Sequence, residues 1–260
     1  MKRTLTVTAA VLTLALLPDS WHARQAQKPA GAQAESPARG GPTVEQIIGK
    51  YVEAIGGEAA YRKLTSRVTK ATFVMPEMEN LTGTAEVYEK APNKSLVVLN
   101  FPGLGVSREG FDGSAGWSQE PTGEVRAMAG AELASARVDA DFYKEIRLGE
   151  IFPRLTLKGT EKVGGRTAYR LEGVSRDGYS ETMYFDAESG LLLRTDSVEE
   201  GPEGKAVLEI HYEDYREVDG IRMPFAARHQ SPEVTILFKL DEVRHNVPIE
   251  DARFNKPAAR

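Results

Sequence analysis

Alternation of apolar and polar residues with a period of two dominates this chain and predicts a protein built mainly of β-strands. The clearest example is residues 179–225, where strand-like segments follow one another through short turns. Asp186 and Gly190 predict one turn, because aspartate can bond backbone N–H groups two residues on and glycine can supply a positive φ. The pair Asp219-Gly220 predicts another, as a two-residue hairpin. We expect four consecutive antiparallel strands here.

Similar segments occur on both sides of this stretch and indicate one large sheet. We expect strands at 66–75, 82–89, 94–101, 104–112, around Trp117, and at 154–161, 167–174 and 233–244. The total is about eleven strands in a single antiparallel sheet, a mainly β (α+β) fold. Crossover helices do not separate the strands, which argues against a doubly wound α/β fold. A sheet of this size curls instead of staying flat.

Helical periodicity occurs in two places. Between 44 and 55 apolar residues recur at helical spacing, Thr43 and Gln46 have the spacing of a capping box, and Gly56-Gly57 predicts the end of the helix. Residues 130–148 form a second segment rich in helix formers, inserted between strands and limited by Pro153. We expect both helical segments to cover the concave face of the curled sheet.

The N-terminal region is typical of an exported protein. Lys2 and Arg3 precede an uncharged apolar run at 5–17, shorter than the ~20 residues of a membrane span, so we expect a signal peptide at 1–23. Residues 24–42 are rich in Ala, Gln, Gly and Pro and predict a disordered linker. The folded domain is expected at 43–257, and the mature protein in the periplasm.

Composition and charge exclude several classes of function. The chain has 260 residues, 41% of them hydrophobic, which is enough for one core. Its formal charge is −5, and because the first 34 residues carry a net +3, the rest carries −8. This acidity argues against nucleic-acid binding and against docking on an anionic membrane. Without cysteine, disulfides, thiolate metal sites and lipid attached to an N-terminal cysteine are excluded. We expect a monomer without cofactor or metal.

Catalytic chemistry has one weak candidate in the sequence. Beyond the signal peptide the histidines are His211, His229 and His245, and none is at metal-ligand spacing with another. Glu209, His211 and Glu213 alternate along one predicted strand and share a face. A hydrolase could use such a trio, but solvated strand faces commonly have the same pattern. Both interpretations stay open.

Large apolar and aromatic residues, spread over most strands and the insert, are the better candidates for a binding site. The candidate ligand-binding residues are Phe73, Leu99, Trp117, Leu133, Val138, Phe142, Tyr184, Tyr212 and Phe238. They could fill a core, or they could line an apolar cavity between the curled sheet and the helices that binds apolar ligands.

Three phrases, together with the order of elements, resemble one known family. They are Gly-Phe-Asp-Gly-x-x-Gly-Trp at 110–117, Tyr-Phe-Asp-Ala-Glu-Ser-Gly-Leu-Leu-Leu-Arg at 184–194, and Asp-Tyr-Arg-Glu-Val-Asp-Gly-Ile-Arg-Met-Pro-Phe at 214–225. Together they resemble the outer-membrane lipoprotein-sorting proteins of the LolA and LolB type over roughly 43–256. The chain is longer than the best-known carriers of that family, and 154–244 is more regular.

The resemblance implies an incomplete β-barrel with a helical lid, whose cavity holds acyl chains and carries lipids or acylated lipoproteins through the periplasm. It implies no catalytic residues. In this interpretation 130–148 is the lid, and Phe142 is the best single ligand contact. An alternative is a sensor or scaffold that binds another envelope protein through a sheet edge.

Overall fold

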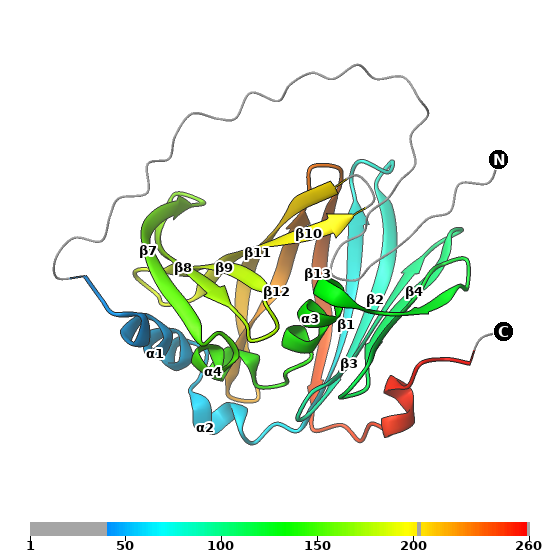
Figure 1. Cartoon of the computed structure of the whole chain (residues 1–260), viewed down its shortest axis with the longest axis horizontal. Coiled ribbons are helices and arrows are strands. Elements are labelled where there is room, and N and C mark those ends of the chain that lie inside the picture. Colours follow the sequence, from blue (N-terminus) through cyan, green and yellow to red (C-terminus); the bar gives the residue numbers. More distant parts are fainter. Residues whose placement is uncertain (1–40, 202–203, 259–260) are drawn as a thin grey trace, which may run out of the picture.

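The computed structural model describes residues 41–201 and 204–258, in which a single antiparallel sheet carries most of its helices on one side (Figure 1). The predicted signal peptide and most of the linker lie outside these residues. The described strands are β1 (Ser66–Met75), β2 (Leu81–Lys90), β3 (Lys94–Phe101), β4 (Gly105–Phe111), β5 (Gly116–Gln119), β6 (Val125–Ala127), β7 (Arg154–Val163), β8 (Arg166–Val174), β9 (Ser180–Asp186), β10 (Leu192–Gly201), β11 (Gly204–Val218), β12 (Ile221–Gln230) and β13 (Thr235–His245). The helices are α1 (Val44–Ala54), α2 (Glu58–Tyr61), α3 (Gly130–Asp139), η1 (Lys144–Ile146), α4 (Leu148–Ile151) and η2 (Asp251–Phe254).

The sheet consists of two meanders joined side by side. Its order is β6-β5-β4-β3-β2-β1-β13-β12-β11-β10-β9-β8-β7, so the first and last strands of the chain pair at its centre. In that pairing Phe73 on β1 lies opposite Phe238 on β13. The predicted class, a mainly β fold with one large antiparallel sheet, is confirmed, with 13 described strands in place of about eleven. The three-residue β6 was not predicted.

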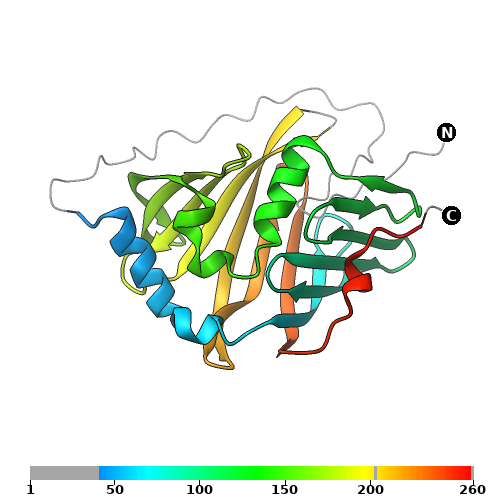
Figure 2. The same ribbon diagram turned by 60° about the horizontal axis from the view of Figure 1, so that its bottom comes forward.

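Topology explains why the helical insert covers the sheet. β6 and β7 are consecutive in the chain but form opposite edges of the sheet. The segment between them must therefore cross its full width, and it does so as α3, η1 and α4 (Figure 2). We call the face that carries these three helices the inner face, and the opposite one the outer face.

The insert is not the continuous helix that its composition predicts. Helix α3 ends at Asp139, and two residues later the Oδ1 atom of Asp141 accepts a hydrogen bond from the backbone N of Tyr143 at 3.0 Å. Such a local side-chain bond competes with helical hydrogen bonding. The chain then continues as the short η1 and α4.

Helix α1 has the ends that the sequence predicts. Its capping box is formed by Gln46 N to Thr43 Oγ1 at 3.3 Å and Thr43 N to Gln46 Oε1 at 2.9 Å. At the other end Gly56 has φ +114°, and a Cβ there would lie 2.3 Å from the carbonyl oxygen of Gly220. Only glycine allows the end of α1 to pack this closely on the β11–β12 hairpin.

Apolar packing forms two clusters on the inner face and two on the outer face. The first inner cluster joins α1, α2 and the insert to β8 and β9, and the second joins β1, β2 and β3 to β13. On the outer face the segment 246–258 covers β1, β3 and β5 through Ile249 and Phe254. A small outer cluster around Tyr184 and Leu193 lies on β7 to β10. Among residues 41–201 and 204–258, no helix has the length and apolarity to cross a bilayer.

Candidate functional site

The middle of the inner face, between the two inner clusters, is the candidate site. Strand pairing places Tyr212 on β11, Ala227 on β12 and Phe238 on β13 in one row across the sheet. A neighbouring row holds Ile210, His229 and Ile236. The small side chain of Ala227 thus lies between two aromatic residues and projects less far from the sheet than they do.

Two polar side chains of these rows are desolvated by the surrounding protein. Burial lowers the pKa of His229 to about 4 and raises the pKa of Tyr212 to about 12. The His229 ring lies against Phe238, with ring centroids 4.8 Å apart, and the Tyr212 hydroxyl lies 3.1 Å from Thr195 Oγ1. Yet both residues are only half-buried and keep accessible surface. The protein around these two side chains therefore removes much of their hydration without covering them completely.

The insert is fixed over the inner face by polar contacts as well as by packing. Lys144 Nζ lies 3.0 Å from Glu181 Oε2 on β9 and 3.1 Å from Asp139 Oδ1. Tyr143 donates its hydroxyl to the carbonyl of Leu64 at 3.0 Å. Arg137 also pairs with Asp177 in the β8–β9 turn. The insert is therefore anchored from both α3 and η1.

The residues predicted to bind ligand do not form one lining. Phe73, Leu99 and Phe238 belong to the second inner cluster, and Val138 and Phe142 belong to the first. Tyr212 lies between these clusters on the inner face. Leu133, on α3, lies above Gly116 of β5, where its Cδ1 atom would be 3.2 Å from an added Cβ. These seven residues share the inner side of the molecule.

Trp117 and Tyr184, in contrast, lie on the outer face. Trp117 packs with Phe254 in the outer cluster, and its Nε1 donates to the Phe254 carbonyl at 2.8 Å. Tyr184 packs with Leu193 and donates its hydroxyl to Asp196 Oδ2 at 2.9 Å. The sequence pattern could not place these two residues, because alternation separates two faces of a strand without saying which one is concave. They are not part of the inner site.

Phe142 is a core residue and not the loosely held lid contact that we predicted. Its side chain is 4% exposed and packs in the first inner cluster, in edge contact with Tyr143 at 5.2 Å between ring centroids. Its backbone N donates to the carbonyl of Pro92 at 3.0 Å. Phe142 follows the end of α3 and precedes η1, in the turn that the Asp141 side chain stabilises. Half-buried Leu133, Tyr212 and Phe238 are the accessible members of the predicted set.

His229 and Ala227 are the inner-site residues that the sequence analysis did not identify. Both lie on β12, whose inward side chains include the small Ala227. A small residue between apolar positions of a predicted strand is a possible sign of a recess, but it also fits an ordinary strand. Its large neighbours on the inner face, Tyr212 on β11 and Phe238 on β13, are set by the pairing of the strands.

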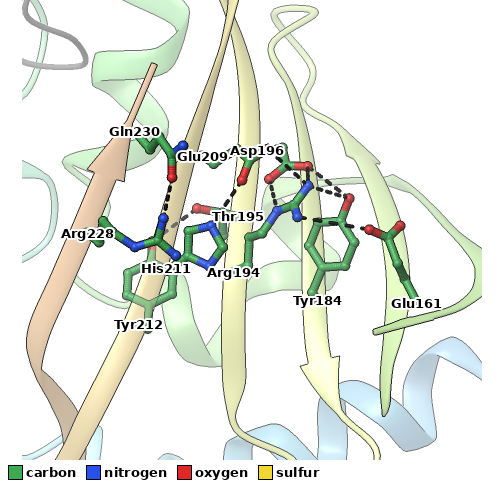
Figure 3. A network of polar contacts seen from close by, with 10 residues as sticks. All are labelled: Glu161, Tyr184, Arg194, Thr195, Asp196, Glu209, His211, Tyr212, Arg228 and Gln230. Carbon is green, nitrogen blue, oxygen red and sulfur yellow. Dashed lines mark hydrogen bonds and ion pairs between the residues drawn. The ribbon is translucent and has the colours of Figure 1, made fainter. Parts of the chain in front are cut away.

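On the outer face, Arg194 on β10 is the centre of a polar network that includes residues of β7, β9 and β11 (Figure 3). Its guanidinium bonds Asp196 at 2.5 and 2.6 Å, lies 3.5 Å from Glu209 and 4.0 Å from Glu161, and covers the Tyr184 ring at 4.5 Å. An arginine surrounded by three carboxylates and a ring ties neighbouring strands together.

The predicted hydrolase trio belongs to the same face. His211 Nε2 lies 3.0 Å from Glu209 Oε2, and Glu209 is shared with Arg194, while Glu213 is exposed. The trio therefore lies on the side of the sheet opposite the insert. Within the described ranges, no group of three or more His, Cys, Asp or Glu side chains is arranged to hold a metal ion.

Comparison with known proteins supports the fold and nothing finer. The sequence matches no family model and shows no significant similarity to a curated protein. Among solved structures, a DUF1329 family protein from Desulfovibrio piger is 18% identical, with a TM-score of 0.55 over 82% of this chain and 97% of that one.

Two further structures with the same fold come from the family that the sequence resembles. A LolA superfamily protein from Nitrosomonas europaea is 14% identical, with a TM-score of 0.54 over 83% of this chain and 99% of that one. A candidate outer-membrane lipoprotein-sorting domain from Vibrio parahaemolyticus is 13% identical, with a TM-score of 0.51 over 80% and 97%. The resemblance to lipoprotein-sorting proteins is thus confirmed for the fold.

Proposed function

We propose that this protein is a periplasmic carrier that holds acyl chains of a lipid or lipoprotein in a recess between the inner face and the insert. The observation that carries the proposal is the state of His229 and Tyr212, which are desolvated by protein and still accessible. Apolar recesses with a few polar groups are the usual sites for apolar ligands. The fold shared with LolA superfamily proteins supports the same function by analogy.

Ala227 offers a sharp test, because its neighbour provides a matched control. Ala227→Phe would fill the space between Tyr212 and Phe238, whereas Ala226→Phe adds the same side chain on the outer face, opposite Lys239. We expect Ala227→Phe to weaken binding of a fluorescent fatty-acyl probe at least about tenfold. Ala226→Phe should leave the affinity unchanged. Equal affinities in two folded variants would contradict an acyl site in this recess.

Native mass spectrometry of protein purified from the periplasm tests the carrier role directly. We expect lipid to copurify with the wild type and to be absent from Ala227→Phe.

N-terminal sequencing of the same sample tests export. A mature protein that starts between residues 24 and 36 fits the predicted signal peptide. A start at Met1 in the membrane fraction would contradict a soluble periplasmic carrier.

The sheet-edge alternative is disfavoured by the edges themselves. β6 has three residues, and the pairing of β7 is irregular between Leu157 and Thr160, where exposed Lys158 lies. Short strands, irregular pairing and lysine all oppose the addition of another strand.

For the hydrolase alternative, the decisive experiment is a substrate screen. The hydrolase hypothesis expects an activity of the wild type that disappears in His211→Ala.

A further inference from the structure

A pocket lies where the C-terminal segment passes the edge strands β4, β5 and β6 (Figure 2). Its volume is about 480 Å³, within the size range of small-molecule sites. The lining comes from these three strands, from the turn between β5 and β6, and from the C-terminal segment. It includes Val106, Arg108, Gln119, Pro121, Val125 and Pro257. We call it the outer pocket.

Strand pairing places the outer pocket on the outer face of the sheet. Gln119 lies two residues after Trp117 on β5, so its side chain points to the same, outer side. Arg108 on β4 and Val125 on β6 both lie opposite Gln119. Val125 also packs against the outer cluster that contains Trp117. The outer pocket is therefore on the other side of the sheet from the insert.

One wall of the outer pocket is the tight turn between β5 and β6. Two backbone hydrogen bonds close this turn, from Glu120 N to the Glu124 carbonyl at 2.9 Å and from Gly123 N to the Glu120 carbonyl at 2.8 Å. A Cβ added at Gly105 would lie 2.7 Å from the carbonyl oxygen of Pro121. Glycine at this position thus lets the start of β4 approach the turn closely.

The other wall is the C-terminal segment, which is tied to the sheet just before it reaches the pocket. Trp117 Nε1 donates to the Phe254 carbonyl at 2.8 Å, and Lys90 Nζ contacts Asp251 Oδ1 at 2.7 Å. Pro257 follows three residues after Phe254 and lines the pocket. Because both walls are fixed by the protein's own contacts, a ligand would not have to order them.

The polar part of the outer pocket offers hydrogen-bond donors. Arg108 Nη1 donates to Gln119 Oε1 at 2.8 Å, and the amide NH₂ of Gln119 keeps its own donors for another partner. Among residues 41–201 and 204–258, no carboxylate lies within ion-pair distance of Arg108, whereas Arg67 and Arg126 each pair with a glutamate. The remaining N–H groups of Arg108 and Gln119 are not among the fully enclosed atoms that lack a partner, so they reach accessible space.

The rest of the lining favours an apolar group with a single negative charge. Val106, Pro121, Val125 and Pro257 present apolar surface. Glu120 also borders the pocket, but only 4% of its surface is exposed, whereas Arg108 is half-buried and presents the accessible charge. One guanidinium balances one negative charge, and its planar N–H groups match the two oxygens of a carboxylate.

We propose that the outer pocket binds small monocarboxylates that carry an apolar group, with the carboxylate on Arg108 and Gln119 and the apolar group against Val125. This site goes beyond the proposed carrier function and does not depend on it, because the two sites lie on opposite faces of the sheet. Charge complementarity selects the carboxylate, and the apolar lining selects the group attached to it.

The test is an NMR titration of the ¹⁵N-labelled protein with cyclohexanecarboxylate, cyclohexanecarboxamide and acetate. We expect cyclohexanecarboxylate to bind at least about tenfold more tightly than either of the others, because the carboxamide lacks the charge and acetate lacks the apolar ring. The shifted signals should include the amides of Arg108 and Gln119 and the indole N–H of Trp117. Absence of shifts at millimolar cyclohexanecarboxylate, or equal affinity for the carboxamide, would overturn the proposal.

Arg108→Met locates the carboxylate, because it removes the guanidinium and keeps an unbranched apolar side chain. We expect it to weaken binding of cyclohexanecarboxylate at least about tenfold and to abolish the preference over the carboxamide. Arg228→Met is the matched control, since Arg228 is also a half-buried arginine that bonds a glutamine, Gln230, but lies on β12 outside the pocket lining. It should change neither value. A preference that persists in folded Arg108→Met, or that Arg228→Met abolishes as well, would overturn the site.

Ala227→Phe separates the outer pocket from the inner face. This variant should leave binding of cyclohexanecarboxylate unchanged, and Arg108→Met should leave binding of the fatty-acyl probe unchanged. Loss of cyclohexanecarboxylate binding in Ala227→Phe would show that the carboxylate binds on the inner face and would overturn the outer site.

Discussion

Lys144 on the insert and Glu181 on β9 form an ion pair in which Nζ lies 3.0 Å from Oε2, with side chains 20% and 5% exposed. Burial by itself lowers the pKa of Lys144, but the charges of Glu181 and Asp139 outweigh it and raise that pKa well above its ordinary value. The pair joins the segment that crosses the sheet to the sheet itself. Loss of this ion pair should therefore lower the free energy of unfolding of the whole domain.

We expect Lys144→Met to lower the free energy of unfolding by about 3–5 kcal/mol, because it leaves the charge of Glu181 buried without a partner. The double variant Lys144→Met/Glu181→Leu should recover most of this loss. Since the pKa of Lys144 is raised, its contribution is complete below the ordinary lysine value and lost only at more alkaline pH. Burial already raises the pKa of Glu181, and loss of Lys144 should raise it further, so the stability of Lys144→Met should fall as pH rises and its difference from the wild type should grow. Denaturant titration between pH 6 and 9 measures this difference.

Lys158→Met is the matched control for this pair. Lys158 and Glu172 are 3.2 Å apart on neighbouring strands, but their side chains are 42% and 38% exposed. Exposed pairs contribute about 0–1 kcal/mol, so this variant should be nearly neutral. A similar cost for both lysines would show that the buried pair has no special role.

Phe142→Ala tests whether the insert is core or lid. Because Phe142 is 4% exposed inside the first inner cluster, we expect a loss of about 3–5 kcal/mol, the cost of removing a packed phenylalanine. Leu104→Ala, at a side chain 46% exposed, should be close to neutral. Thermal and denaturant unfolding measure both. A cost near 1 kcal/mol at Phe142 would instead support a lid that opens easily.

His229 should make the domain sensitive to acid. Its pKa falls from 6.5 to about 4 on folding, so the unfolded chain binds the proton more readily and the free energy of unfolding falls as pH falls between these values. At 1.36 kcal/mol per unit, the loss amounts to about 3 kcal/mol. His229→Phe, which keeps a ring against Phe238, should remove this part of the acid sensitivity. Parallel pH profiles of the two proteins between pH 7 and 4 would contradict the assignment.

Gly190 should resist substitution for two reasons that can be separated. Its φ is +79°, and an added Cβ would lie 2.9 Å from Lys50 Cγ and 3.0 Å from the Lys50 carbonyl oxygen. Gly165 has a similar φ of +81° with no atom within 4 Å of an added Cβ. We expect Gly165→Ala to cost about 1 kcal/mol from strain alone and Gly190→Ala about 1 kcal/mol more. Equal denaturant midpoints would mean that Lys50 moves aside freely.

Features that depend on a few neighbouring residues could be predicted from the sequence. The capping box of Thr43 and Gln46, the positive φ of Gly190 and the Asp219-Gly220 turn all follow from local side-chain and backbone chemistry. The alternation of apolar residues likewise predicted most strands, because a half-buried strand must alternate. The mainly β class follows from the number of such segments.

The membership of the site was decided by tertiary structure. Trp117 and Tyr184 have the same strand-like surroundings as Phe73 and Tyr212, yet they point to the outer face. One reason is that irregular pairing changes the alternation, as between Leu192 and Arg194, where Leu193 joins the outer cluster of Tyr184. The other reason is that the pattern of apolar residues in one strand does not show which of its two faces a distant segment will cover.

By itself, then, the sequence determined the strands, their turns and the single-sheet class, since these depend on interactions within a few residues. Tertiary structure decided that β1 pairs with β13 and that the chain crosses from β6 to β7. That crossing makes one face of the sheet the inner face and buries Phe142 in the core. It also brings Lys144 to Glu181 from segments far apart in the chain, and such long-range contacts depend on the path of the whole backbone.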